Sequence, residues 1–342
     1  MFVIYHSSDS FAGIAGVSMV SLFENNKHFP KIHVHYIERD MTDENKELLL
    51  SIAIKYGRTI EFMEMPNWSD KLNIELKSCK DGWLGFGYNR LFLTEYISCD
   101  IDRVLYLDCD TIVEGPLDDL WNTDLTGYYL AGVDDCLSRK YRRIVGVPTE
   151  GTYCNAGMLL INLQKWREDN VKQAFIDQLY LNNGYFVFNE QSLINSLFAG
   201  KIKILPQKYN VNSLVYVFDY KELMKLRRPQ HFSYCEQEYK DAKFNPVITH
   251  YTGLFYVERR PWIELSDHPH RDAFFKYKAL SPWKNTPFYK DRRSIKTKIY
   301  TRICHILPRP FMIYVVSLLY NDLRPIWFEL KLRKVRGICR NG

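Results

Sequence analysis

Short apolar runs alternate with apolar residues at helical spacing along the first 205 residues of the chain. Runs rich in β-branched and aromatic residues predict strands over Phe2–His6, Lys31–Ile37, Thr59–Met63, Arg103–Val113, Tyr128–Val133, Gly157–Asn162 and Lys201–Leu205. Helical spacing predicts helices between them, over Gly13–Asn25, Asp43–Tyr56, Gly87–Ile97, Gln164–Leu181 and Glu190–Phe198. Because strands alternate with helices, the pattern favours an α/β fold with a mostly parallel sheet flanked by helices.

The composition supports a large folded core and excludes several classes of protein. Of the 342 residues 46% are apolar and 15% aromatic, which excludes a disordered chain, and 17 Gly with 14 Pro exclude a collagen-like one. The eight cysteines are scattered without a C-x-x-C pair, a usage typical of a reduced, cytosolic protein. The opening residues, Met1–His6, lack a basic segment and are predicted to form a first strand rather than a signal peptide. The longest apolar run, Phe311–Tyr320, is about half of the roughly 20 residues that span a bilayer.

The positive charge of the chain is concentrated at its C-terminal end. Residues 281–342 hold 14 of the 46 Lys and Arg but three of the 40 acidic residues, so they carry +11 and residues 1–280 carry −5. Cations and bulky apolar groups interleave there, as where Ile326, Trp327 and Phe328 precede Lys331 and Arg333. This pattern predicts a membrane-association segment over 281–342 that binds an anionic membrane surface, with an ordinary helical subdomain as the alternative. Single-stranded nucleic acid also binds such surfaces, but residues 1–280 contain no recognisable nucleic-acid module, so we expect no nucleic-acid partner.

Two acidic residues follow the most strongly apolar strand. Leu105, Tyr106 and Leu107 indicate a buried strand, and Asp108 and Asp110 come directly after it. Ligands of open α/β sheets bind beyond the carboxyl ends of strands, so both carboxylates are expected to face that crevice. Buried together they would repel each other unless a divalent cation lay between them, and Mg²⁺ or Mn²⁺ binds carboxylate oxygen while leaving positions for phosphate. The alternative is two acids that cap helices or form surface ion pairs.

Two classes of enzyme carry such a pair of acids. The segment Asp108–Thr111 is similar to the nucleophile motif of haloacid-dehalogenase-type phosphatases, which lies after the first strand of their sheet. Here about a hundred residues of strands and helices come first. In nucleotide-sugar transferases the two acids hold a metal ion on the diphosphate of the donor. The remainder of the chain distinguishes the two classes.

Five segments, in the same order along the chain, resemble the motifs of family 8 glycosyltransferases. The most specific runs from Tyr153 to Arg167 and resembles the Phe-Asn-Ala-Gly-hydrophobic-Ile-Asn-Leu-x-x-Trp block of that family. The other segments are Phe2–Val20, Leu105–Asp110, Asn189–Gln191, and His250–Gly253 together with Arg260–Trp262. The resemblance covers residues 1–265 and implies a GT-A fold over 1–280, a UDP-sugar donor, Mn²⁺ dependence and retention of anomeric configuration.

The resemblance implies that Asp108, Asp110 and His250 are the metal ligands. Two carboxylates and one imidazole suit Mn²⁺ better than Mg²⁺, which remains an alternative. A lone histidine is otherwise more often a core or turn residue. The resemblance also implies that Gly253 lets the backbone approach the diphosphate. Arg260 would contact the diphosphate where the family has Lys, but the intervening loop is longer than usual and Arg259 is an equal candidate.

Further residues would hold the nucleotide. Phe11 stands where the family stacks an aromatic ring on uracil, with a core aromatic as the alternative. Ser8 replaces a family Asp, so Asp9 is expected to carry the polar contact to the base. Arg90 matches an Arg that holds the donor phosphate and a nearby carboxylate, and Cys109 lies between the two metal-binding acids.

The remaining matched positions would surround the donor sugar. Asp135, Asn155 and Ala156 line the sugar by resemblance, with Asp134 as an alternative to Asp135. Glu190 stands where the family has Asp, and Gln191 lies near the reacting carbon. The candidate catalytic residues are Gln191, Glu190, Arg90, Asp135 and Asn155, whereas Ala156 is expected to bind the donor. An amide is a poor nucleophile, so we expect front-face return, in which the leaving phosphate deprotonates the acceptor and the Gln191 carbonyl stabilises positive charge at C1.

Together these features predict a cytoplasmic enzyme at the inner face of the cell membrane. It would move a hexose from UDP-glucose or UDP-galactose to a glycan acceptor. The basic segment suggests a lipid-linked acceptor, as in surface polysaccharide or lipooligosaccharide assembly. One alternative is a non-catalytic nucleotide-sugar-binding protein, which Glu190 in place of Asp keeps open, and the other is the phosphatase class.

Overall fold

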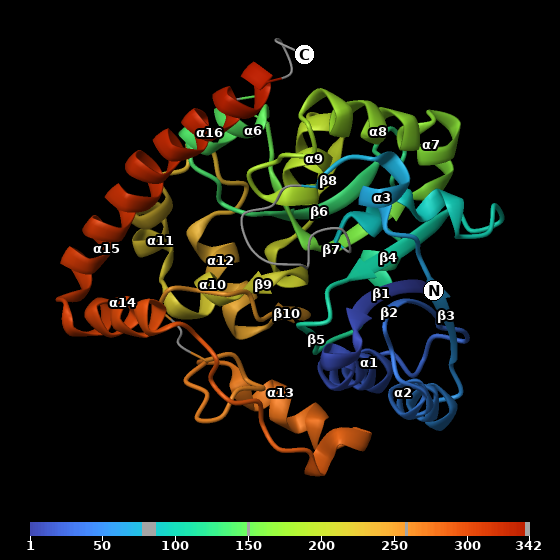
Figure 1. The fold of residues 1–342 in the computed structure, drawn as a ribbon. Helices are drawn as coiled ribbons and strands as arrows, with labels where there is room; N and C mark the ends of the chain where they lie inside the picture. Colours follow the sequence, from blue (N-terminus) through green and yellow to red (C-terminus); the bar gives the residue numbers. More distant parts are fainter. Residues whose placement is uncertain (77–86, 149–150, 257–258, 339–342) are drawn as a thin grey trace.

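A seven-stranded mixed sheet forms the centre of the protein, in the order β3-β2-β1-β4-β7-β6-β8 (Figure 1). The structure is a computed structural model that describes residues 1–76, 87–148, 151–256 and 259–338. The strands are β1 (Phe2–Ser8), β2 (His33–Arg39), β3 (Thr59–Glu64), β4 (Arg103–Leu107), β6 (Leu130–Asp134), β7 (Cys154–Asn162) and β8 (Ile202–Ile204). Strand β7 runs antiparallel between β4 and β6, and the other neighbouring strands of this sheet are parallel. The prediction of a mixed, mostly parallel sheet flanked by helices is confirmed.

Helices cover both faces of this sheet. In the first half they are α1 (Ala12–Asn25), α2 (Asp43–Lys55), α3 (Trp68–Leu72), α5 (Asp118–Trp121), α6 (Arg139–Val145), α7 (Leu163–Glu168) and α8 (Val171–Leu181), with 3-10 turns η1 (Asp9–Phe11) and η2 (Tyr88–Glu95). In the second half they are α9 (Asn189–Leu197), η3 (Gln207–Tyr209), α10 (Ser213–Val217), α11 (Tyr220–Arg227), α12 (Glu236–Phe244), α13 (Arg271–Lys278), η4 (Pro282–Asn285), α14 (Ile295–Ile306), α15 (Arg309–Leu318), the π-helical turn η5 (Leu319–Leu323) and α16 (Arg324–Ile338).

Alternate residues of the central strands enter two separate cores. Val3 and Leu105 pack with α1 and α2 on one face, and Ile4 and Tyr106 pack with η2 and α7 to α9 on the other. Because both faces are buried, these strands are continuous apolar runs in the sequence. Helix α2 begins where predicted, since the Thr42 hydroxyl accepts from the Asn45 N–H.

Three of the predicted elements differ in the structure. The segment expected to be one helix over Gln164–Leu181 is the pair α7 and α8, separated at Asn170, whose φ of 48° ends the first helix. The helix expected over Gly87–Ile97 is the 3-10 helix η2, with a kink at Phe92. The run Arg103–Val113 is two strands, because the chain turns at the Asp108–Asp110 segment.

A second, three-stranded sheet connects the segment after Asp110 with strands from the C-terminal half of the chain. It contains β5 (Thr111–Val113), β10 (Ile248–His250) and β9 (Val211–Asn212) in the order β5-β10-β9. Strands β5 and β10 are antiparallel, and Thr111 pairs with His250. This register places His250, which is 140 positions after Asp110 in the chain, next to the two acids.

The C-terminal segment is helical and packs against the body, as Figure 1 shows for α14 to α16. Trp283 of η4 lies on α1 over Gly16, where an added Cβ would be 2.2 Å from its ring. Met312 and Val316 of α15 join the core formed by α10 to α12, and Phe328 of α16 packs near Tyr141. The predicted basic helical extension is confirmed, and its boundary near residue 280 stays a prediction. Within the described residues, no helix combines the length and apolarity needed to cross a bilayer.

Candidate active site

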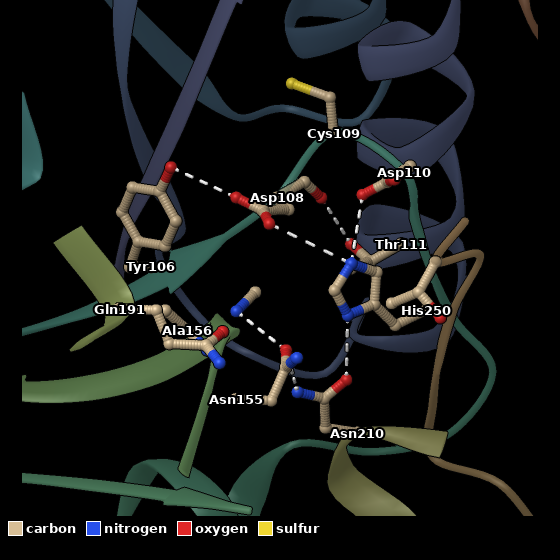
Figure 2. Close-up of polar contacts among 12 residues, drawn as sticks. Tyr106, Asp108, Cys109, Asp110, Thr111, Asn155, Ala156, Gln191, Asn210 and His250 are labelled. Carbon is tan, nitrogen blue, oxygen red and sulfur yellow. Dashed lines mark hydrogen bonds and ion pairs between the residues drawn. The ribbon is translucent and has the colours of Figure 1, made fainter. Parts of the chain in front are cut away.

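Asp108, Asp110 and His250 meet at the carboxyl end of β4. The His250 Nε2 atom lies 3.2 Å from Asp110 Oδ1 and 3.8 Å from Asp108 Oδ2 (Figure 2). One ligand atom of each of the three residues lies within 4.8 Å of the others. Two carboxylates and an imidazole that converge in this way could hold a divalent cation such as Mn²⁺. Among the described residues one other group has this property, His33, His35 and Glu61 on β2 and β3.

Two residues position the His250 ring. Its Nδ1 atom lies 3.1 Å from the Asn210 side-chain carbonyl, which only accepts, so Nδ1 carries the proton and Nε2 is left to face the acids. Gly157 of β7 lies against the other side of the ring, where an added Cβ would be 2.1 Å from His250 Cε1. Gly157 is therefore required for the close approach of the ring rather than for a special backbone conformation.

Asp110 and His250 shift each other's pKa values. Burial lowers the pKa of His250, but the Asp110 charge and hydrogen bond outweigh burial and raise that pKa above its ordinary value. Burial raises the pKa of Asp110, and the charges of His250 and Arg260 outweigh it, so the Asp110 pKa lies below its ordinary value. Asp110 is therefore ionised near neutral pH and available as a ligand.

Arg90 connects Asp108 with Ala156 and Glu190. Its guanidinium lies over the Tyr106 ring at 4.1 Å, donates to the Ala156 carbonyl at 2.6 Å and to Asp108 Oδ1 at 3.1 Å, and pairs with Glu190 Oε1 at 3.5 Å. Burial raises the pKa of Glu190, and the Arg90 charge opposes this. A buried guanidinium needs such partners, and Asp108, Glu190 and the Ala156 carbonyl supply them.

Gln191 is held by three hydrogen bonds. The Ala156 N–H can only donate, so the Gln191 amide oxygen faces it at 3.0 Å. The amide nitrogen then donates to Asp135 Oδ2 at 3.1 Å and to the Tyr153 hydroxyl at 3.2 Å. Asn155 lies beside this group, where its oxygen accepts from the Gly157 N–H and from the Asn210 amide, both at 3.0 Å.

The two adjacent acids Asp134 and Asp135 face different surroundings. Asp134 is fully buried, accepts from the Ser233 N–H and hydroxyl at 3.1 and 2.7 Å, and lies 3.8 Å from Arg142. Asp135 instead faces Gln191, and burial raises its pKa. The structure thus places Asp135, rather than the alternative Asp134, beside the candidate catalytic amide.

Arg260 contacts Asp110, whereas Arg90 contacts Asp108. Its Nη1 atom is 3.2 Å from Asp110 Oδ2, and its Nη2 atom would be 3.1 Å from a Cβ at Gly253. The Arg259 N–H donates to Asp267 Oδ1 at 2.7 Å. Of the two candidate arginines, Arg260 is the one whose guanidinium the structure brings to the acids, and residues 257–258 lie outside the described residues.

The residues proposed for the nucleotide base lie at the end of β1. Asp9 Oδ1 accepts from the Thr42 N–H and hydroxyl and from the Asn45 amide, so it fastens the start of α2. Ser8 contacts the Ser10 hydroxyl at 3.2 Å, and Phe11 is half-buried against the core. The Cys109 thiol donates to the His6 carbonyl at 3.0 Å and points away from the triad, so only its backbone could contact a ligand there (Figure 2).

Three residues of this arrangement escaped the sequence analysis. Asn210 bridges His250 and Asn155, Tyr106 supports Arg90, and Arg227 is close enough for its charge to oppose the raised pKa of Asp135. Tyr106 lies in the strand that the apolar run identified, whereas no local pattern marks Asn210 or Arg227 as a neighbour of the site.

Known proteins share this fold and sequence pattern. The model of the family described as glycosyl transferase family 8 matches residues 2–265. Lipopolysaccharide 1,2-glucosyltransferase of Escherichia coli is 27% identical over 281 residues, which cover 81% of this chain and 77% of the relative. General stress protein A of Bacillus subtilis is 24% identical over 286 residues, covering 83% and 94%.

Among solved structures, galactosyltransferase LgtC in complex with donor and acceptor sugar analogues superimposes with a TM-score of 0.67. At 24% identity the match covers 82% of this chain and 96% of LgtC, and it shows that both share the GT-A fold. The family match spans more than three quarters of the chain and includes every strand of the central sheet and the whole Asp108–Asp110–His250 group. The chain therefore belongs to glycosyltransferase family 8.

Proposed function

We propose that this glycosyltransferase moves a hexose from a UDP-sugar to a lipid-linked glycan, with Mn²⁺ as its metal and with retention of anomeric configuration. The observation that carries the proposal is the convergence of Asp108, Asp110 and His250 beside the Asp135–Gln191 pair. A metal ion on Asp108, Asp110 and His250 would supply positive charge for a diphosphate. Asp135 and Gln191 beside it supply polar groups for a sugar. The glucosyltransferase and galactosyltransferase relatives support glucose or galactose as the hexose.

The residues present fit a divalent metal ion. Asn210 fixes the His250 tautomer, Gly157 leaves room for its ring, and the two carboxylates face the same side. The mixed oxygen and nitrogen donor set favours Mn²⁺ over Mg²⁺. When bound, the ion would supply a Lewis acid that neutralises the diphosphate leaving group.

The protein side chains would bind and orient the donor around this centre. Arg260 and the backbone at Gly253 would contact the diphosphate, and Phe11 would stack on uracil, with Ser8 and Asp9 nearby. Asp9 already accepts three hydrogen bonds through one carboxylate oxygen, so its other oxygen would make the contact to the base. Glu190 and Asn155 would bind sugar hydroxyls through their oxygens.

Retention follows from the side on which the acceptor attacks. The bond from C1 to the phosphate oxygen breaks, the bond from C1 to the acceptor oxygen forms on the same face, and the acceptor proton passes to the leaving phosphate oxygen. The remaining lone pair of the Gln191 carbonyl would stabilise positive charge at C1, because Asp135, Tyr153 and Ala156 hold the amide in one orientation.

The experiment is UDP-glucose and UDP-galactose hydrolysis by the full chain, with Mn²⁺ and after metal removal with EDTA. We expect Mn²⁺-dependent release of UDP with one of the two donors and a loss of at least 100-fold in Asp110→Asn, while the exposed Asp241→Asn serves as the matched control. Binding of UDP-sugar without turnover, with or without glycan acceptors, would favour the non-catalytic alternative. A phosphorylated Asp108 after incubation with p-nitrophenyl phosphate would favour the phosphatase class.

The exposed face of the C-terminal helices supports binding to the inner face of the cell membrane in the cytoplasm. Ile295, Ile299, Ile303 and Ile306 form a stripe at helical spacing on α14, exposed at 76, 55, 49 and 73%. Exposed Lys296, Lys298 and Arg302 flank the stripe, as in helices that lie in the headgroup layer of anionic membranes.

The membrane proposal is tested with phosphatidylglycerol vesicles. The double variant Ile299→Glu with Ile303→Glu should lower the vesicle-bound fraction at least ten-fold, because it places acids in the stripe without opening the core. Leu50→Glu with Ile54→Glu changes an equally exposed pair on α2 and should have less than a two-fold effect. Vesicle binding that is unchanged by the first pair would contradict the proposal.

A further inference from the structure

An apolar cavity of about 610 Å³ lies between α11 and the C-terminal helices. Its walls come from α11, from the segment after β10, and from α14 to α16 with η5, including Arg227, Gly253, Phe255, Leu323, Arg324 and Trp327. Figure 1 shows α11 beside α15 at this side of the molecule, and the two helices are in contact. The volume lies within the range of small-molecule sites, roughly 300 to 1,000 Å³.

The cavity adjoins the candidate active site at Gly253. Gly253 lines the cavity and also lies against Arg260, whose guanidinium reaches Asp110. Arg227 lines the cavity from α11, and its positive charge acts on Asp135, which holds Gln191. A molecule in the cavity would therefore lie next to residues that border the candidate active site.

The partly buried Arg227 faces the cavity without a hydrogen-bonding partner among the described residues. Its guanidinium lies over the Tyr320 ring at 4.1 Å, its Nε atom is buried without a hydrogen bond, and it forms no ion pair with any described residue. The neighbouring Arg228 in contrast pairs with Asp322 at 2.7 Å and donates to the Ser317 carbonyl at 2.9 Å. The charge of Asp135 acts on Arg227, but no described carboxylate forms an ion pair with it. Its hydrogen-bond donors next to an apolar wall are therefore left for an anionic group of a ligand.

Part of the apolar wall is exposed to solvent. Leu319, Leu323 and Trp327 line the cavity but are exposed at 41, 59 and 51%. Leu319 and Leu323 lie on η5 and Trp327 on α16, and α15 separates these elements in the chain from α14, which bears the isoleucine stripe. An alkyl chain could thus pass from a bilayer into the cavity while it keeps apolar contacts along its length.

From these observations we propose that the cavity binds the lipid part of the acceptor, and that Arg227 pairs with the phosphate that joins the lipid to its sugar. This rests on the proposed transfer to a lipid-linked glycan and names the chemistry of that acceptor. The phosphate would lie between the alkyl chain in the cavity and the acceptor hydroxyl at the reacting carbon. Arg227 is in this sense a specificity-determining residue, with no part in breaking the donor bond.

Isothermal titration of the full chain with octyl phosphate, below its micelle concentration, tests this proposal. We expect one saturable site that binds octyl phosphate at least ten-fold more tightly than octyl glucoside or inorganic phosphate. Arg227→Gln should remove the preference for octyl phosphate over octyl glucoside. Leu323→Trp should fill the cavity and weaken both alkyl ligands at least ten-fold. Ile326→Trp, three residues further along on α16 and outside the cavity, should change them less than two-fold.

Several outcomes would overturn the proposal. Equal binding of octyl phosphate by the parent chain and Leu323→Trp would place the lipid elsewhere, and equal affinity for the phosphate and the glucoside would remove the role of Arg227. Loss of phosphatidylglycerol vesicle binding in Leu323→Trp would make the cavity a site for membrane headgroups. A parent dimer that Leu323→Trp dissociates would identify the occupant as a second copy of the chain.

The result is separable from that of the proposed function, because Mn²⁺-dependent UDP-hexose hydrolysis needs no acceptor. Hydrolysis without octyl phosphate binding would refute the cavity assignment alone. Octyl phosphate binding without hydrolysis of either donor would refute the proposed function and leave the cavity as a site for a lipid phosphate.

Discussion

Replacement of Gly157 by Ala tests whether the position of the His250 ring controls the metal site. A Cβ at residue 157 would lie 2.1 Å from His250 Cε1, 2.6 Å from Nδ1 and 2.9 Å from Nε2. Ordinary contact begins near 3.4 Å, so the ring and the β7 backbone must separate by about 1.3 Å. His250 is 4% exposed and tied to Asn210, so the ring has little space to yield.

A displacement of this size should affect metal binding more than folding. Misplacing a reacting or binding group by about 1 Å costs on the order of 100-fold, or about 2.7 kcal/mol. Overpacking the core costs about 1 to 3 kcal/mol of folding free energy, which a domain of this size tolerates. We therefore expect Mn²⁺ affinity to fall about 100-fold in an Mn²⁺ titration followed by electron paramagnetic resonance, and UDP-hexose hydrolysis to fall at least as much.

Gly115→Ala is the matched control for this experiment. An added Cβ there would meet Val247 at 3.5 Å, an ordinary contact distance, and the position lies outside the candidate site. Mn²⁺ affinity should be unchanged in that variant. If Gly157→Ala folds with a native circular dichroism spectrum and keeps its Mn²⁺ affinity within three-fold, His250 is not a ligand and the proposed metal site is wrong.

Three further predictions concern single side chains. Asn210→Ala should lower Mn²⁺ affinity about 10-fold because His250 loses its orienting partner. Asn210→Asp should restore that affinity, but it cannot donate to Asn155, so the KM for the donor should stay raised. Equal Mn²⁺ affinity in both variants and the parent would contradict this prediction. Gln191→Ala should lower turnover at saturating donor at least 30-fold without changing Mn²⁺ affinity, and a loss of only a few-fold would refute a role at C1. Burial lowers the pKa of His35 from 6.5 to about 4, so between these values the unfolded chain binds a proton that the folded chain does not. His35 should accordingly account for about 2 kcal/mol of the fall in unfolding free energy between pH 7 and pH 5, measured in urea as the difference between the parent and His35→Phe. A His35→Phe variant with the same slope as the parent would contradict the assignment.

Much of the fold could be predicted from local pattern. The strand positions and the mostly parallel sheet follow from apolar runs, because strands buried on both faces leave continuous apolar segments in the sequence. The two helix predictions that differ failed where a local backbone choice intervened, at the left-handed Asn170 and at the kink of Phe92. Neither the left-handed residue nor the kink changes the spacing of apolar residues from which the helices were predicted.

The candidate site was less accessible to such reasoning. Asp108 and Asp110 could be placed at a strand end from sequence, and the family resemblance added His250. The pairing of β5 with β10, the bridge through Asn210 and the space left by Gly157 depend on contacts between residues 40 to 139 positions apart. Such contacts are set by how the strands pack, and no local periodicity carries them.

The sequence by itself determined the alternation of strands and helices, the acids after β4, and a net charge of −5 on residues 1–280 against +11 on the C-terminal segment. These are local or additive properties, which the order of residues fixes directly. The tertiary structure alone decided that Asp135 rather than Asp134 faces Gln191, and that the same C-terminal helices both expose an apolar stripe and wall a cavity beside Arg227. A helix has several faces, and only the packing of its neighbours determines which of them is buried, which is exposed and which encloses a site.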